Sequence, residues 1–337
     1  MNSIKKMMLS GALGCLISGM AYADGSSPQP VKPYWQDIQV VAVNKEKPRS
    51  SFMSYADRET ALTSRFEKSP YYSLLNGTWK FFFVDSYKDL PQNITDPSVN
   101  TSSWDDITVP GNWEVQGHGV AIYTNHGYEF KPRNPQPPLL PEANPVGVYR
   151  RDIEIPANWD NRDIYLHIGG AKSGLYVYLN GKEVGYSEDS KNPAEFLINK
   201  YLQPGKNVLT LKIFRWSTGS YLECQDFWRM SGIERDVFLW SQPKASIQDF
   251  RVVSTLDDTY TNGIFKLAVD LKNHTQETKN LNVGYELLDA KGNLVASEAN
   301  DIWVSPASPQ TASFEYDLKN VAPWSAEHPN LYKLLMT

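Results

Sequence analysis

The densest group of residues able to do chemistry lies between Arg215 and Arg235, where the sequence reads RWSTGSYLECQDFWRMSGIER. Within seven positions this stretch holds Glu223, Gln225, Asp226, Trp228 and Arg229. It does not alternate as a strand would, so it predicts a loop, and loops carry binding residues more often than core strands do. Aromatic rings can stack on sugar rings while carboxylates and amides bond to hydroxyl groups. The stretch therefore indicates a carbohydrate site.

A structural explanation of the same stretch is equally compatible with the spacing. In that alternative, Trp228 fills the core and Arg229 forms a salt bridge with Asp226. Cys224 has no base nearby in the sequence, so we expect it to be a buried and inert thiol. The residue types alone leave the two explanations open.

A second group lies between Trp113 and Asn144. The run Tyr123-Thr124-Asn125-His126 offers hydroxyls, an amide and an imidazole in a row, although an ordinary turn would explain these four residues as well. A proline-rich tract follows, which predicts extended backbone. Neither His118 nor His126 has a partner at metal-ligand spacing, so a zinc site is not expected.

The composition excludes several classes of protein. The 337 residues include 33 Lys plus Arg against 38 Asp plus Glu, and the net charge of −5 gives no basic surface for nucleic acid. Two cysteines cannot build a zinc finger or a disulfide scaffold. No segment of the mature chain is apolar for long enough to span a membrane. The length favours two folded units.

Strand patterns separated by turn residues run through most of the chain and predict an all-β fold. Clear strands are expected at 79–84, 149–155, 163–168, 175–179, 183–186, 208–214 and 235–240, with one short helix near 55–67. Asn180-Gly181, between two of these strands, predicts a hairpin. Many short strands at this spacing indicate an antiparallel sandwich over residues 56–243, preceded by an extended lead-in over residues 24–55.

A second strand series begins after Pro243 and predicts an immunoglobulin-like sandwich over residues 244–337. Its clearest strands are expected at 265–271, 281–288, 312–318 and 331–336. The last of them stops at Thr337 with no closing hairpin, which would leave an edge to be covered. We therefore expect this sandwich to be truncated and the chain to be the front part of a longer protein.

The first 23 residues have the layout of a secretory signal peptide. Lys5 and Lys6 precede a short apolar run, and Ala21-Tyr22-Ala23 supplies a cleavage site. We expect export to the periplasm or the medium, with lipid anchoring through Cys15 as the minority alternative. Removal of this segment would leave Cys224 as the only thiol, which excludes an intramolecular disulfide.

Four segments carry a specific resemblance: VPGNWEVQGHGVAIYTN, NPVGVYRRDIEIP, YLNGKEVGYSEDSKNPAEFLINKYLQPGKN and RWSTGSYLECQDFWRMSGIERDV. With them the chain resembles the N-terminal portion of a long-form β-galactosidase of glycoside hydrolase family 2. The resemblance implies a galactose-binding-like jelly roll followed by an immunoglobulin-like sandwich. It also implies a partner, the (β/α)₈ barrel that carries the catalytic glutamates and is absent from this chain.

At residue level the resemblance places the Asn of the family's YTN motif on Asn125 and the Asp of its QDxWRMSGI motif on Asp226. It implies that both contact galactose, that Asp226 also ligates a sodium ion, and that Trp228 and Arg229 brace the loop. Magnesium would act, if at all, in the absent barrel. No catalytic residue is expected in this chain.

The resemblance thus implies an exported, retaining enzyme that hydrolyses terminal β-D-galactosides, and a chain that is inactive alone. β-Galactoside oligosaccharides are the expected ligands, and homo-oligomers are a further expected partner. Three alternatives stay open: a galactoside-binding module without activity, a purely structural assembly domain, and another exo-glycosidase such as a β-glucuronidase.

Overall fold

The computed structural model describes residues 32–337 except 131–133 and 307. The expected signal peptide, with Cys15, lies outside the described residues. Nearly all regular structure is antiparallel β-sheet, as predicted, and it forms two sandwiches, each with its own buried core. Among the helices of the described ranges, none has the length and apolar character needed to cross a membrane.

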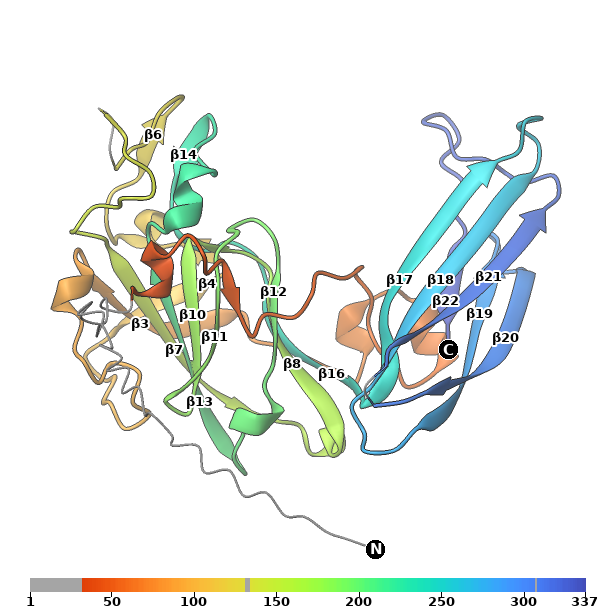
Figure 1. Ribbon diagram of the computed structural model, residues 1–337, viewed down its shortest axis with the longest axis horizontal. Coiled ribbons are helices and arrows are strands. Elements are labelled where there is room, and N and C mark those ends of the chain that lie inside the picture. Colours follow the sequence, from red (N-terminus) through yellow and green to blue (C-terminus); the bar gives the residue numbers. More distant parts are fainter. Residues whose placement is uncertain (1–31, 131–133, 307) are drawn as a thin grey trace, which may run out of the picture. The chain divides into compact units, whose positions relative to one another are not determined.

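The first sandwich is built on a seven-stranded sheet in the order β1-β11-β10-β13-β7-β3-β4 (Figure 1). These strands are β1 (Ala42–Val43), β11 (Lys182–Ser187), β10 (Gly174–Leu179), β13 (Lys206–Phe214), β7 (Val146–Glu154), β3 (Gly77–Val84) and β4 (Asp105–Val109). The four-stranded sheet of this sandwich comprises β12 (Ala194–Leu197), β8 (Arg162–Ile168), β16 (Val237–Pro243) and β2 (Tyr72–Leu74).

Two small sheets complete this domain. One has three strands, β5 (Gly111–Asn112), β15 (Gly232–Ile233) and β9 (Ala171–Lys172). The other is a two-stranded ribbon of β6 (Ile122–Thr124) and β14 (Phe227–Arg229), seen at one end of the domain in Figure 1. The ribbon joins the two segments that the sequence analysis singled out, although they are about a hundred residues apart in the chain.

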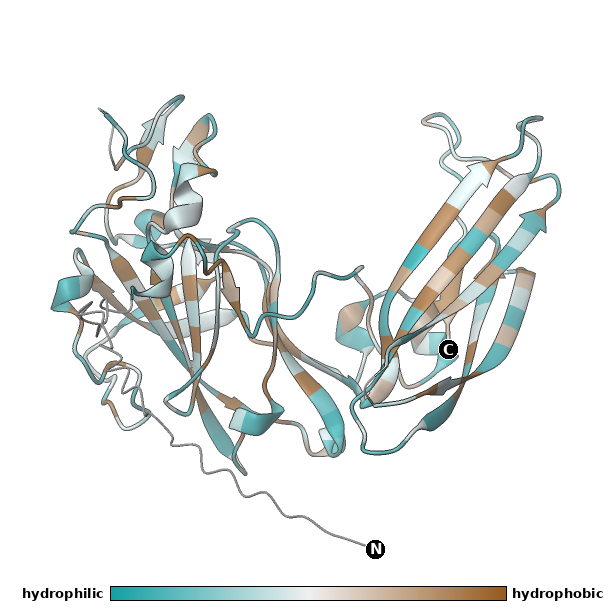
Figure 2. Cartoon of the chain, viewed as in Figure 1, coloured by the Kyte–Doolittle hydropathy of each residue, from teal (hydrophilic) through white to brown (hydrophobic). Residues whose placement is uncertain are grey.

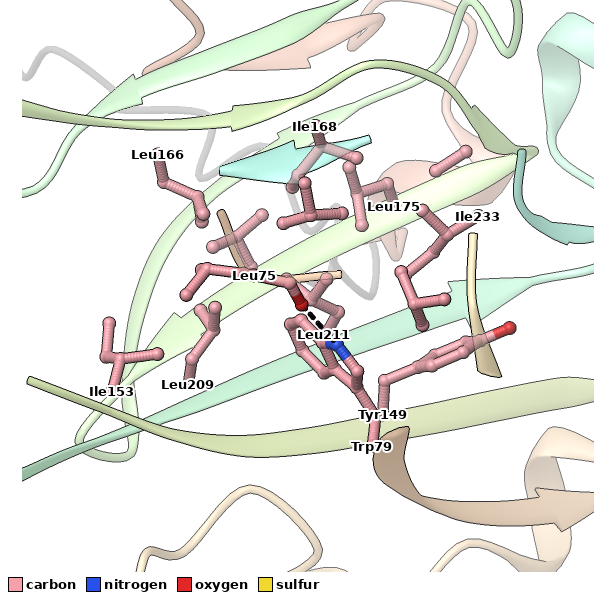
Figure 3. Packing of buried hydrophobic residues seen from close by; sticks show 14 of the residues in the cluster. Leu75, Trp79, Tyr149, Ile153, Leu166, Ile168, Leu175, Leu209, Leu211 and Ile233 are labelled. Carbon is pink, nitrogen blue, oxygen red and sulfur yellow. Dashed lines mark hydrogen bonds between the residues drawn. The ribbon is translucent and has the colours of Figure 1, made fainter. Parts of the chain in front are cut away.

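The core of the first sandwich comes from the inward side chains of both large sheets. Leu166, Leu211 and Tyr149 are fully buried in it, and the indole of Trp79 donates to the carbonyl oxygen of Leu75 at 2.8 Å (Figure 3). That bond satisfies the one polar atom of a large buried ring. The hairpin predicted at Asn180-Gly181 is confirmed, and both residues have positive φ angles (53° and 78°) as a type I′ turn requires.

The second sandwich packs two three-stranded sheets against each other. Their strands are β17 (Ala245–Leu256), β18 (Gly263–Asn273) and β21 (Gln310–Leu318) in one, and β20 (Leu294–Val304), β19 (Lys279–Leu288) and β22 (Lys333–Met336) in the other. Hydrophobic and hydrophilic residues alternate along these strands (Figure 2). On β18 the alternation places Phe265, Leu267 and Val269 in the core. β22 pairs with β19 along one edge.

The helical content is small. The helix predicted near 55–67 is a five-residue α1 (Arg58–Leu62) followed by a 3₁₀ turn at Phe66–Lys68, and Asp57 caps α1 by accepting from the amide of Thr60. The remaining 3₁₀ turns are Tyr34–Gln36, Tyr87–Asp89, Glu114–Gln116, Ala157–Trp159, Asn199–Tyr201 and Thr218–Tyr221. Near the start of the described chain, Trp35 is buried and stacks on Phe214.

Candidate functional site

The β6–β14 ribbon carries the expected sugar-binding residues at one end. Its register pairs Thr124 with Phe227 and Tyr123 with Trp228. Asn125 immediately follows β6 and Asp226 immediately precedes β14, so the continued register places them opposite each other. Both residues are exposed. The structure therefore brings the two predicted residues together at the surface of one domain.

Asp226 is held by the neighbouring strand. The hydroxyl of Tyr123 donates to Oδ1 of Asp226 at 2.9 Å, and this bond to a carboxylate raises the pKa of the Tyr123 phenol. On the Asn125 side, the amide oxygen lies 2.7 Å from Nδ1 of His126. The carboxylate of Asp226 keeps its second oxygen, and Asn125 keeps its amide nitrogen, for an outside partner.

Trp228 and Arg229 are placed differently from the structural alternative considered above. The side chain of Trp228 does not fill the core, because it is 53% exposed and packs beside Tyr123, which is 56% exposed. Arg229 is buried but does not pair with Asp226. Its Nε lies 3.6 Å from Oε2 of Glu129. Arg229 is thus buried and Trp228 is exposed, and the bracing role expected of both stays a prediction.

The loop that leads into Asp226 is anchored by two carboxylates, those of Glu188 and Glu223. Glu188 accepts from the hydroxyl of Thr218 at 2.9 Å and from the amide of Gly219 at 2.7 Å, which holds the 3₁₀ turn at Thr218–Tyr221. Glu223 accepts from the amide of Ser190 at 2.7 Å and from its hydroxyl at 2.6 Å. Glu223, a candidate on sequence grounds, is therefore a tether of the loop. Gln225 is exposed, and its amide donates to the carbonyl oxygen of Leu222.

Of the residues around the candidate site, Tyr123 was named from the sequence as a hydroxyl, and its contact with Asp226 was not predicted. Glu129 was not singled out at all. Glu129 is a buried carboxylate that pairs with Arg229 and also accepts from the indole nitrogen of Trp216 at 3.0 Å. No local pattern marks Glu129, since its partners come from a distant part of the chain.

Cys224 lies in the same region, and its surroundings disfavour the reactive thiolate form. Burial and the nearby carboxylate of Glu129 raise the pKa of the Cys224 thiol to about 11. Its sulfur donates to the carbonyl oxygen of Ser220 at 3.0 Å. These features fit the expectation of an unreactive thiol.

The ribbon can supply one ligand to a cation but not a whole coordination shell. Within residues 32–337 outside the two gaps, no group of three His, Cys, Asp or Glu side chains is placed to hold a metal ion. Asp226 offers a hard carboxylate oxygen of the kind that alkali and alkaline-earth ions prefer. Of the expected sodium ligands, the described residues therefore offer the single carboxylate of Asp226. A cavity of about 1140 Å³, lined in part by Val252, Phe265 and Met336, does not include Asn125 or Asp226.

Comparison with known families gives two matches that together extend over most of the chain. Residues 72–243 match the sugar binding domain of glycosyl hydrolases family 2, and residues 245–337 match a further family 2 domain. These matches correspond to the two sandwiches described above.

Curated relatives of similar sequence are named β-galactosidases. That of Priestia megaterium is 38% identical over 309 residues, and that of Vibrio cholerae is 35% identical over 308 residues. Each alignment takes in 90% of this chain but only 30% and 29% of the relative. The chain thus spans about three-tenths of the length of the relatives it matches.

Solved structures with the same fold include β-glucuronidases. A Bacteroides uniformis β-glucuronidase superposes with a TM-score of 0.65 at 21% identity, covering 79% of this chain and 30% of that one. An uncultured Clostridium β-glucuronidase gives a TM-score of 0.58 at 21% identity, covering 79% of this chain and 42% of the other. At this identity the likeness concerns the fold. With its two sandwiches and both domain matches, the chain belongs to glycoside hydrolase family 2.

Proposed function

We propose that this chain is part of an exported, retaining β-galactosidase and forms one wall of its galactose site. The observation that carries the proposal is the pairing of β6 with β14, which sets Asn125 opposite Asp226 with both side chains exposed. An amide and a carboxylate side by side can each bond to adjacent hydroxyls of one sugar ring. The β-galactosidases that share about a third of its sequence support galactose as that sugar.

In this proposal the chain binds and orients the galactoside. The groups that break the glycosidic bond lie outside this chain. Retaining hydrolysis needs an acid/base and a nucleophilic carboxylate about 5–5.5 Å apart. We assign neither role to this chain, and both belong to the barrel expected beyond the two sandwiches. Asp226 would supply one carboxylate ligand to a sodium ion, which would place positive charge beside a galactose hydroxyl.

The first test is an activity assay of the chain by itself. The 337-residue protein should not hydrolyse p-nitrophenyl β-D-galactoside above the buffer rate, while a protein that carries these residues and the barrel should. Turnover by the isolated chain would contradict the proposal that the catalytic acid/base and nucleophile lie outside this chain. Side-by-side assays with the β-D-glucuronide of the same chromophore distinguish the β-glucuronidase alternative, which the solved β-glucuronidase structures keep open.

The second test is a substitution of Asp226 in the complete protein. Asp226→Ala should lower kcat/KM by about 10- to 150-fold, the loss that follows when a charged hydrogen bond to the transition state is removed. Sodium should no longer stimulate the residual activity. The melting temperature should not change, because Asp226 is exposed. Asp258→Ala, at another exposed carboxylate, is the matched control and should leave activity intact. A large fall in melting temperature for Asp226→Ala would assign the residue a structural role.

The binding-module alternative differs in the behaviour of the chain alone. Since Asn125 and Asp226 provide only one wall, calorimetry with galactose should show weak or no binding to the isolated chain. Binding tighter than about 0.1 mM, a free energy of roughly −5.5 kcal/mol, would favour a lectin-like module instead.

A further inference from the structure

We propose that Glu129 and Arg229 act as positioning residues that set Asn125 against Asp226. This inference rests on the proposed function. Glu129 follows Asn125 by four residues, and Arg229 follows Asp226 by three. Their side chains meet inside the domain, with Nε of Arg229 3.6 Å from Oε2 of Glu129 and only 1% and 3% of the two side chains exposed. One buried ion pair thus joins the two segments that carry the candidate site.

The site needs such a connection because the ribbon is short. β6 and β14 pair at only three positions, and two-stranded sheets of this kind are marginally stable by themselves. Asn125 and Asp226 lie just beyond the last pair, at the end where strands fray. Glu129 and Arg229 fix both segments from the opposite, buried side.

The contacts of the pair extend to every segment around the site. Arg229 lies over the ring of Phe227 at 4.9 Å, and its Nη2 donates to the carbonyl oxygen of Thr124 at 3.4 Å. Glu129 accepts from the indole of Trp216 at 3.0 Å, and its Oε2 lies 3.7 Å from the sulfur of Cys224. The carboxylate therefore connects the segment after Asn125 with both ends of the loop that precedes Asp226.

Because Glu129 and Arg229 are buried, the attraction between them is stronger than it would be at the surface. Water and salt screen charges at the surface, whereas two buried charges interact strongly. Removal of Glu129 takes away the carboxylate that faces Arg229. Glu129 itself also interacts with the buried cations Lys172 and Arg215. Loss of the Glu129 charge should therefore release Arg229 from its present place, and with it the register of β14 relative to the segment after β6.

The test uses the isolated chain and signals that report on the site directly. Glu129→Gln removes the charge and can keep an acceptor for Trp216. Arg229→Met removes the partner charge and keeps an apolar stem over Phe227. Each variant should raise amide exchange in β6 and β14 by at least about tenfold, move the side-chain amide signals of Asn125, and bring the Tyr123 phenol titration closer to its ordinary range. The double variant should do little more than either single one, because the two residues act as one pair.

The control breaks a different buried ion pair in the same domain. Arg49 and Glu195 are 2.8 Å apart and nearly buried, and they are remote in sequence from the ribbon. Glu195→Gln should lower the melting temperature without moving the Asn125 or Tyr123 signals. If Glu129→Gln leaves those signals unchanged, or if Glu195→Gln moves them equally, the positioning role is wrong.

A variant that keeps the charge covers the case in which Glu129→Gln does not fold. Glu129→Asp shortens the side chain by one methylene, so it should fold and still move the Asn125 signals. Unchanged Asn125 signals in Glu129→Asp would also count against the proposal. The Asp226→Ala assay, in a protein that carries these residues and the barrel, separates the two hypotheses. If that variant keeps full activity although Glu129 controls the Asn125 signals of the isolated chain, the proposed function fails and the positioning role stands.

Discussion

Strand alternation decides which side chains of the candidate site meet solvent. Asp226 and Arg229 are three positions apart, so they lie on opposite faces of the ribbon and cannot pair. Asp226 and Trp228 are two positions apart and share the exposed face with Tyr123. The same rule sends Arg229 into the domain, where Glu129 neutralises it. Whether a side chain of β14 is exposed or buried therefore depends on whether its position along the strand is odd or even.

The contact between Tyr123 and Asp226 gives a prediction that can be measured without substrate. Because the hydrogen bond and the negative charge of Asp226 both stabilise the protonated phenol, they raise the pKa of Tyr123. Asp226→Asn should lower that pKa, as followed by NMR of chains labelled at the tyrosine ζ carbon. Asp258→Asn serves as the control and should leave the Tyr123 titration unchanged.

Cys224 should react slowly with alkylating reagents. Burial and Glu129 raise its pKa to about 11, so at pH 8 its thiolate fraction is on the order of a hundredfold below that of a free cysteine. Iodoacetamide labelling of the folded chain, followed by mass spectrometry of the Cys224 peptide, measures this rate. Glu129→Gln should increase the rate, since it removes one of the groups that disfavour the thiolate. Labelling of native Cys224 as fast as that of the unfolded chain would contradict the prediction.

At the scale of elements, the segment before the first sandwich is fastened to it by a buried network. The guanidinium of Arg49 lies 4.3 Å from the ring of Trp240 and donates to both carboxylate oxygens of Glu195. His167 lies 2.8 Å from the same carboxylate. The end of the lead-in around Arg49 is thus part of the folded domain, held at β12 and β8.

This network predicts a specific loss of stability in acid. Burial by itself would raise the pKa of Glu195, but the hydrogen bonds from His167 and Arg49 outweigh it and lower the pKa to about 2. The folded state therefore gains stability that is present above pH 4.5 and is lost as the pH falls towards 2. From the shift in pKa this gain is about 3 kcal/mol.

Glu195→Gln tests that account by urea unfolding at two pH values. The variant should be less stable than the wild type at pH 7 by roughly 3–5 kcal/mol, because Arg49 is left buried without its partner. The difference should shrink at pH 2–3, where the wild-type carboxylate is itself becoming protonated. A difference that is the same at both pH values would show that Glu195 does not contribute through its charge.

At the scale of the whole molecule, each sandwich has a main hydrophobic core of its own. Leu211 is buried in the first sandwich and Leu267 in the second, and the two clusters share no residue. Replacing a buried leucine by alanine costs about 2–5 kcal/mol. Calorimetry should therefore show two transitions, one lowered by Leu211→Ala and the other by Leu267→Ala. If each variant lowers both transitions equally, the sandwiches unfold as one unit.

Much of the architecture could be predicted from local sequence. Alternating runs identified most long strands, because burial of one sheet face imposes a period of two residues. Asn180-Gly181 identified its hairpin, because both positions require positive φ angles. Short elements such as β6 were not identified, since three residues carry too little periodicity to be recognised.

The sequence by itself determined the class of fold and the two strand series. It also identified Asn125 and Asp226 as candidate sugar-binding residues, through the motifs in which they lie. Only the tertiary structure decided that Asn125 and Asp226 are neighbours and that Arg229 pairs with Glu129. The same holds for the hydrogen bonds by which Glu223 holds its loop to Ser190. These are pairings between residues about thirty to a hundred positions apart. Local sequence encodes which face a side chain takes, but the partner it meets there depends on how distant strands align.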